Sequence, residues 1–440
     1  MRSIFTVAHR WAGLFIGVFL FIAGLTGAVI SWDHELDEWL NPHLFDAKAT
    51  GTPLSPFELV RRVEAADPKI QVTFFPLTYE EGHNAKLFVE PRVNPATGAL
   101  HTVAYNQVFV EPASGEIAGR RYWGAISLDT ENLLPFLYKL HYSMHIPDFW
   151  GIDRWGLWFM GIVGIVWMFD CFVGFYLTLP RKGAQATNGM DADRASSDGA
   201  RRTWWERWKP AWKIKRGASA YRLNLDLHRA FGLWLWMMLF ILAFTSISMN
   251  LNNEVVRPIL SRLSTLTPDA FDDRTPAALN KPIAPKLSSE QALEIASGIA
   301  RERGWVEPAG SIFYGRLHGL FAVSFFQPGD DHGSGGMGVK MIFLDGATGA
   351  HQGGRVPWKG TAADIFMQLQ FPLHSGRIAG VPGRAFLSFM GLVVALLSAT
   401  GIYIWFKKRG ARLSRAVAQR EQAEFIEKRQ APIRRPLVTD

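Results

Sequence analysis

Cysteine is nearly absent from this sequence of 440 residues. The single one, Cys171, lies inside an apolar run. One cysteine excludes an internal disulfide, a cysteine-ligated iron–sulfur cluster and a C-x-x-C-H site for covalent haem attachment. Any metal centre in this chain would therefore need other ligands.

Charged residues are also scarce, at 20%, whereas 17 Trp and 31 Phe are present. This composition is typical of a membrane protein with aromatic belts at its interfaces. The net charge of +8 does not indicate nucleic acid, because the basic residues concentrate beside the apolar runs, where membrane topology places them. We expect the lipid bilayer as a partner and no nucleic acid.

Four apolar runs are long enough to cross about 30 Å of hydrocarbon, which takes about 20 residues. They are residues 11–31, 156–179, 231–251 and 385–406, and only the second contains a charge, at Asp170. A cleaved signal peptide is an alternative for the first run. The run is long for the apolar part of such a peptide and lacks a small-x-small cleavage motif, so we expect a membrane helix.

The charges between these runs predict their orientation. Residues 181–222 carry eleven Lys and Arg against four Asp and Glu, and the tail after Phe406 carries ten against four. Residues 33–151 are acidic instead, with sixteen Asp and Glu against nine Lys and Arg. Because cytoplasmic loops are enriched in Lys and Arg, we expect the connector, the tail and the N-terminus in the cytoplasm and the acidic segment on the opposite side.

The two long segments outside the spans resemble each other. Each begins with a capped amphipathic helix, near residues 54–60 and 287–293, because a Ser precedes a Glu or Gln by three residues. A strand, a tight turn and a second strand are predicted around residues 108–115 and 342–349. Each segment is thus expected to be a small α+β module.

The spans are similar in the two halves as well. His9-Arg10-Trp11-Ala12-Gly13 parallels His228-Arg229-Ala230-Phe231-Gly232, and Val173-Gly174-Phe175-Tyr176 parallels Thr400-Gly401-Ile402-Tyr403. Both halves start in the cytoplasm, so we expect a parallel duplication about an axis along the membrane normal.

The sequence therefore predicts an α-helical integral membrane protein with four transmembrane helices and two outer α+β modules. The expected regions are membrane helix one (1–32), outer module one (33–152), membrane helix two (153–180), a cytoplasmic basic connector (181–222), membrane helix three (223–251), outer module two (252–383), membrane helix four (384–406) and a cytoplasmic basic tail (407–440).

Four histidines occur at repeat-related ends of the spans. His9 and His228 stand at the inner starts of spans one and three, and His145 and His374 precede spans two and four on the outer side. A helix rises 1.5 Å per residue, so the two levels are about 25–30 Å apart and cannot share one metal ion. We expect two centres, one between His9 and His228 and one between His145 and His374.

Paired imidazoles without cysteine are typical of haem b held in a helical bundle. A mononuclear zinc or copper site would usually use more ligands at each level. The expected cofactors are therefore two b-type haems, with the iron bound by these histidines. Arg10, Arg229 and Arg377 lie near the candidate ligands and are candidates to pair with haem propionates.

His141 is an alternative outer ligand, because it lies one helical turn before His145 on the same face. The repeat aligns His145 with His374 and His141 with Gln370, which favours His145. Asp170 is costly within a span and is expected to face the bundle interior. It could orient a ligand imidazole or relay a proton, and both roles stay open.

Two further histidines are interpreted structurally. His34 has Asn253 as its repeat partner and is expected to be a residue of the membrane interface. Asp330-Asp331-His332, followed by Gly333-Ser334-Gly335-Gly336, could bind a cation, but a hairpin loop is the favoured interpretation.

Taken together, the His-Arg-x-x-Gly entry to a span, the histidine before the next span, the Thr-Gly-x-Tyr exit and the helix–strand–turn–strand modules resemble the PepSY-associated transmembrane family. The resemblance covers about residues 1–410. The family includes dihaem b ferrisiderophore reductases of the bacterial inner membrane. It implies a multi-pass location there, with both termini cytoplasmic and two PepSY-like periplasmic modules. It also implies haem ligands at His9, His228 and the outer histidines.

The resemblance further implies a membrane oxidoreductase that passes electrons outward and reduces a periplasmic ferric siderophore, or another Fe(III) chelate, to release Fe(II). No Gly-x-Gly-x-x-Gly motif occurs in a cytoplasmic segment, and the connector is too short for a Rossmann domain. The electron donor would therefore be quinol or a separate cytoplasmic reductase. The alternative is a haem-free protein whose periplasmic modules sense or inhibit a partner. A transporter is less consistent with spans that carry few charges.

Overall fold

The computed structural model describes residues 1–180 and 203–430. Within them, three helices are long and apolar enough to cross a membrane: α1 (Arg2–Ile30), α6 (Trp155–Thr178) and the segment Arg377–Ala423, most of which belongs to α14 (Gly380–Gln430). The bent pair α9 (Ala220–Trp234) and α10 (Trp236–Asn250) gives a fourth if it is counted as one span. These helices overlap the four predicted apolar runs.

The bend between α9 and α10 is 72° and lies at Leu235. The first turns of α9 are polar, and its Asp226 is fully buried in ion pairs with Arg222 and Arg229, each at 3.0 Å. This polar half has its own partners. Helix α10 is uncharged and mostly apolar, with Thr245, Ser246, Ser248 and Asn250 in its second half, and π-helical turns follow it at Asn252–Val256. His228 lies on α9, before the bend.

The chain forms two compact units. The first comprises Met1–Phe21, Val166–Phe240 and Val393–Asp440, and the second comprises Ile22–Ile165 and Ile241–Leu392. In the first unit, α8 (Trp204–Trp208) and a 3-10 turn (Lys209–Trp212) pack Trp208 against Phe175 and Leu233.

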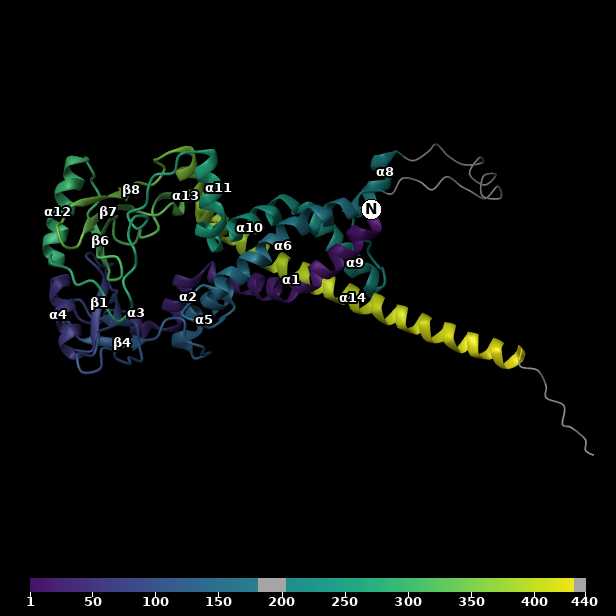
Figure 1. Ribbon diagram of the computed structural model, residues 1–440, viewed down its shortest axis with the longest axis horizontal. Coiled ribbons are helices and arrows are strands. Elements are labelled where there is room, and N and C mark those ends of the chain that lie inside the picture. Colours follow the sequence, from purple (N-terminus) through teal and green to yellow (C-terminus); the bar gives the residue numbers. More distant parts are fainter. Residues whose placement is uncertain (181–202, 431–440) are drawn as a thin grey trace, which may run out of the picture. The chain divides into compact units, whose positions relative to one another are not determined.

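Helix α14 continues without a break to Gln430 (Figure 1), well beyond the expected end of the fourth span. The predicted linker around residues 185–199 lies outside the described residues.

The second unit contains one antiparallel sheet of eight strands in the order β4-β3-β2-β1-β5-β6-β7-β8. Each outer segment supplies a helix and a four-stranded meander, and the two meanders join where β1 pairs with β5, at Phe74–Phe313 and Phe75–Ile312. The pairing removes an exposed edge from each half-sheet. The bounds are β1 (Ile70–Pro76), β2 (Ala85–Pro91), β3 (Gln107–Val110), β4 (Ile117–Arg121), β5 (Ala309–Gly315), β6 (Leu320–Phe325), β7 (Lys340–Asp345) and β8 (His351–Arg355).

Helices α4 (Pro56–Ala66) and α12 (Ser289–Glu302) cover one face of this sheet, and their buried side chains share one core with strands of both meanders. Side chains alternate between faces along a strand. Val108 and Val110 accordingly join that core, whereas Phe109 packs on the other face against Leu44 of α3 (Pro42–Phe45). The remaining helices of the unit are α2 (Asp33–Leu40), α5 (Thr130–Ser143), α11 (Arg257–Leu263) and α13 (Ala362–Ser375), with short 3-10 turns at Ser334–Gly336 and Arg377–Ala379.

The two expected tight turns are present and closely alike. Gly115 has φ +75 and donates to the Glu111 carbonyl at 2.8 Å, and Gly349 has φ +74 and donates to the Asp345 carbonyl at 2.8 Å. In the second turn, Arg274 at 2.6 Å holds the pKa of Asp345 down at about 2, with help from Thr348. Only glycine adopts this left-handed conformation without strain.

We expect Gly349→Ala to destabilise the protein by about 1–2 kcal/mol from backbone strain alone. The new Cβ would also lie 2.8 Å from Ile295 Cδ1. Gly298→Ala is the matched control, because Gly298 lies within α12 with nothing within 4 Å of an added Cβ. Alanine there should be neutral or stabilising. The thermal midpoints of the two purified variants in detergent test this, and equal midpoints would contradict it.

Candidate metal centres

The first unit brings His9 of α1 and His228 of α9 together. Their ring centroids are 6.1 Å apart, with an angle of 59° between the ring planes. Each ring is held through Nδ1: His9 by the Asp170 carboxylate of α6 at 2.8 Å, and His228 by the Leu397 carbonyl and the Thr400 hydroxyl of α14 at 3.0 and 3.1 Å. In a neutral imidazole, an Nδ1–H that donates to one of these oxygens leaves the Nε2 lone pair as the possible metal ligand.

The two halves hold these inner rings with different groups at matching positions. In the alignment of the Gly-x-Tyr motifs, Asp170 corresponds to Leu397 and Val173 to Thr400. A carboxylate therefore orients His9, whereas a backbone carbonyl and a hydroxyl orient His228. Of the two roles left open for Asp170, the structure favours orienting an imidazole.

The second unit forms a similar pair, between His141 of α5 and His374 of α13. Their ring centroids are also 6.1 Å apart, at 62°. His141 Nδ1 contacts the Ala23 carbonyl at 2.9 Å and the Thr26 hydroxyl at 3.2 Å, and His374 Nδ1 contacts the Thr245 hydroxyl at 2.9 Å.

Thr26 and Thr245 occupy equivalent places in the two halves, 17 residues after His9 and His228 respectively. Each threonine donates its own hydroxyl proton to the carbonyl four residues earlier, at 2.8 Å. Its oxygen is then an acceptor for the histidine Nδ1–H, which fixes the tautomer of His374 and supports that of His141. Sequence reasoning missed both threonines, although their equal spacing from the inner histidines was a usable signal.

The structure pairs His374 with His141 and not with His145, which the repeat alignment favoured. Helix α5 ends at Ser143, Met144 and His145 have positive φ, and His145 Nε2 contacts the Phe136 carbonyl at 2.9 Å while its ring stacks on Phe136 at 4.7 Å. His141 lies two residues before the end of α5, and His374 lies one residue before the end of α13. In the structure, His141 is therefore the counterpart of His374. The repeat alignment had favoured His145, one helical turn further along the chain.

Glycines lie directly against three of these rings. A Cβ added at Gly174 would stand 3.5 Å from His9 Cε1, at Gly401 3.2 Å from His228 Cε1, and at Gly27 2.9 Å from His141 Cε1. Other span glycines serve close helix packing: a Cβ at Gly391 would lie 2.5 Å from the Gly24 carbonyl, and one at Gly161 would lie 2.4 Å from Leu251. Some span glycines thus allow close helix packing, and others allow close approach to the histidine rings.

The spacing of both pairs fits one metal ion between two imidazoles. If the Nε2 atoms of a pair faced one ion from opposite sides, a metal–nitrogen bond of about 2 Å and about 1.1 Å from nitrogen to ring centre would place the two centroids about 6.2 Å apart. Both observed spacings are 6.1 Å. Two imidazoles that are each held through Nδ1 can offer Nε2 to a metal, which matches the donor set of a b-type haem.

The arginines proposed for propionate pairing differ in availability. Arg229 pairs with Asp226 and also donates to the Pro210 carbonyl at 2.8 Å. Arg377 lies 3.8 Å from Asp33. Arg10 lies over the ring of Trp11, and its Nε, like that of Arg229, is buried without a hydrogen-bond partner in the described part of the chain. Unlike Arg229, it forms no ion pair with a described carboxylate. Arg10 is therefore the best placed of the three to pair with an added anion.

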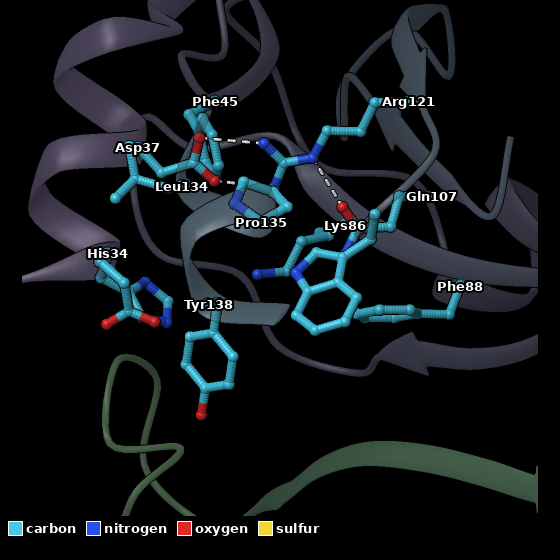
Figure 2. Close-up of a pocket in the computed structure, with 12 residues that line it drawn as sticks. His34, Asp37, Phe45, Lys86, Phe88, Gln107, Arg121, Leu134, Pro135 and Tyr138 are labelled. Atoms are coloured by element: carbon cyan, nitrogen blue, oxygen red, sulfur yellow. Dashed lines mark hydrogen bonds and ion pairs between the residues drawn. The ribbon is translucent and has the colours of Figure 1, made fainter. Parts of the chain in front are cut away.

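A small pocket opens in the second unit beside the sheet (Figure 2). It is lined by polar and aromatic residues from α2, β2, β3, β4 and α5, among them His34, Lys86 and Tyr138. Burial lowers the pKa of Lys86 and raises that of Tyr138. At its back, Asp37 and Arg121 form a bidentate ion pair at 2.9 and 2.7 Å.

The fold and these sites define a helical membrane protein with paired histidines and an extramembrane α+β sheet. The chain belongs to the PepSY-associated TM region family, whose sequence profile matches residues 6–408. This confirms the family that the sequence motifs indicated. A comparison with curated proteins found no match.

Proposed function

We propose that this protein is a transmembrane electron conduit of the bacterial inner membrane, with two b-type haems and four spans in a parallel duplication. It reduces a ferric siderophore or another Fe(III) chelate on the periplasmic side. The observation that carries the proposal is the pair of histidine couples, each with a 6.1 Å ring spacing and each with Nδ1 engaged.

In this proposal, His9 and His228 hold the inner haem, and His141 and His374 hold the outer one. Bound haem supplies one-electron redox chemistry. The protein fixes the imidazole orientation through Asp170, the Leu397 carbonyl, Thr26 and Thr245, and supplies Arg10 for a propionate.

The overall reaction takes one electron per Fe(III). The electron comes from quinol or from a separate cytoplasmic reductase, and the Fe(II) product is held less tightly by the hard oxygen ligands of a siderophore. The acidic and aromatic outer segments provide the substrate side.

Reconstituted proteoliposomes test the activity. With a quinol analogue or a chemical reductant inside and a ferric chelate outside, the protein should release Fe(II) that a membrane-impermeant ferrous chelator detects. Vesicles with no protein provide the baseline, and a rate equal to that baseline with every donor would contradict the proposal.

Asp170→Asn should raise the reduction potential of the inner haem. A carboxylate that accepts from Nδ1–H makes the imidazole more basic and stabilises Fe(III). Replacing it with a neutral amide removes about 1 kcal/mol of that preference, or about 40 mV for one electron. A potentiometric titration followed by optical spectra measures the shift.

Thr400→Val is the matched control, because His228 keeps the Leu397 carbonyl at 3.0 Å. Its inner potential should move by less than half as much. An unchanged or lower potential in Asp170→Asn would show that this carboxylate does not act on an iron ligand.

A further inference from the structure

Three metal-ligating side chains outside the paired histidines meet in the second unit. His34 lies in α2, directly after α1, and Asp331 and His332 lie in the connection between β6 and β7. One ligand atom from each of the three lies within 4.8 Å of the others. The rings of His34 and His332 are perpendicular, with centroids 5.9 Å apart.

The donor atom of His332 is free. Its Nε2 is buried, lies 3.7 Å from Asp331 Oδ1 and has no hydrogen-bond partner among the described residues. A buried polar atom without a partner is uncommon and requires an explanation. His34 Nδ1 lies 3.8 Å from Glu38 Oε1, beyond hydrogen-bond distance.

The connection that carries His332 is held in place by its own backbone. Gly338 donates to the His332 carbonyl at 2.9 Å and Gly333 to the Asp330 carbonyl at 3.2 Å. Gly333 has φ +68, and a Cβ there would lie 2.0 Å from the Gly338 carbonyl oxygen. These contacts keep Asp331 and His332 beside His34.

Fixed charges nearby favour a cation. Asp33 and Glu38 adjoin the cluster, to which Asp331 itself contributes a carboxylate. Arg377, 3.8 Å from Asp33, is a nearby opposing charge that also acts on His332. His34 also lines the pocket described above, together with Lys86 and Tyr138 (Figure 2). The cluster therefore stands at the edge of an open cavity, which gives an ion a path of entry.

We propose that His34, Asp331 and His332 form a non-haem site for one divalent transition metal ion. Two imidazoles and one carboxylate are a donor set typical of Fe(II) and Zn(II) and not of Ca(II) or Mg(II). Tetrahedral ligands at bond lengths of about 2.1 Å lie about 3.4 Å apart, so three donor atoms within 4.8 Å of one another would each have to move inward by about 0.8 Å. In a ferric-chelate reductase, a role that rests on the proposed function, this site would receive the Fe(II) product.

Zinc binding to the purified full-length protein in detergent tests the site, because haem contributes no zinc. Equilibrium dialysis with elemental analysis should show one more ion bound per chain in wild type than in His34→Ala or His332→Ala. It should also show an affinity at least about tenfold lower in Asp331→Asn, since even outer-sphere substitutions cost 10–100-fold. The matched controls His101→Ala and His351→Ala remove other histidines of the same unit and should bind as wild type does.

The same dialysis is repeated anaerobically with Fe(II), which is the product of the proposed ferric-chelate reduction, and wild type should again bind one more ion than the site variants. Equal zinc binding in wild type and all three site variants would overturn the proposal, as would no zinc binding by wild type. Haem content is measured on the same samples. Colourless protein that binds zinc at this site would refute the haem proposal alone, and red protein that binds none would refute the metal site alone.

Discussion

His141→Ala is expected to leave the protein with one haem in place of two and to lower ferric-chelate reduction at least 100-fold. His141 is the partner of His374 in the outer pair, and its Nδ1 is already held by Ala23 and Thr26. A haem bound at the proposed outer site would keep only His374 as a ligand, whereas the inner pair keeps Asp170, Leu397 and Thr400. Haem content and the rate of Fe(II) release in proteoliposomes measure the two effects.

His145→Ala is the matched control, four residues away in the same short stretch. It removes a ring that stacks on Phe136, so a modest loss of stability is expected and both haems should remain. The reverse result, with His145→Ala losing a haem and His141→Ala retaining two, would show that His145 is the outer ligand, as the repeat alignment favoured. It would contradict the pairing of His141 with His374.

Arg121→Leu is expected to destabilise the protein by about 3–5 kcal/mol, because it leaves a buried carboxylate without its counter-ion. Arg121 and Asp37 are 5% and 7% exposed. The guanidinium also donates to Gln107 at 2.7 Å and to the Glu131 carbonyl at the start of α5 at 3.0 Å. It thus ties α2, β4 and the helix that carries His141 together.

Two controls separate charge from packing. Asp37→Leu with Arg121→Leu removes both charges and should recover more than half of the lost stability, since a buried ion pair replaced by apolar groups is often close to neutral. Arg61→Ala breaks the exposed pair with Glu58 at 2.9 Å and should leave the thermal midpoint close to that of wild type. Thermal midpoints in detergent compare the three. A double variant no more stable than Arg121→Leu would show that shape, and not charge, sets the cost.

Much of the local structure was predictable because its signals are local. Apolar length located the membrane helices, and Gly115 and Gly349 marked the two turns that require positive φ. The predicted capping box is present at Ser288 and Gln291 of α12, whereas Ser55 makes no side-chain cap at α4. The inner couple, His9 with His228, followed from identical motifs at equivalent span ends. These features depend on residues close together in the sequence, so hydrophobic periodicity and turn chemistry were sufficient to predict them.

The remaining features depend on contacts between distant segments. Residues one turn apart on a helix share a face, so the pattern alone could not separate His141 from His145, and the end of α5 at Ser143 decided between them. The pairing of β1 with β5 joins two modules that sequence reasoning treated separately. His34 and His332 belong to different modules and come together only because the two modules share one sheet. The sequence around either histidine therefore could not predict their contact.

Haem content tests the central claim most directly. The full-length protein, purified from cells supplied with a haem precursor, should be red. Its reduced pyridine derivative should have the spectrum of haem b at two haems per chain, falling to one in His228→Ala and in His374→Ala. A colourless protein that takes up no haem on reconstitution would contradict the account, and so would a single substitution that removes both haems while the fold survives.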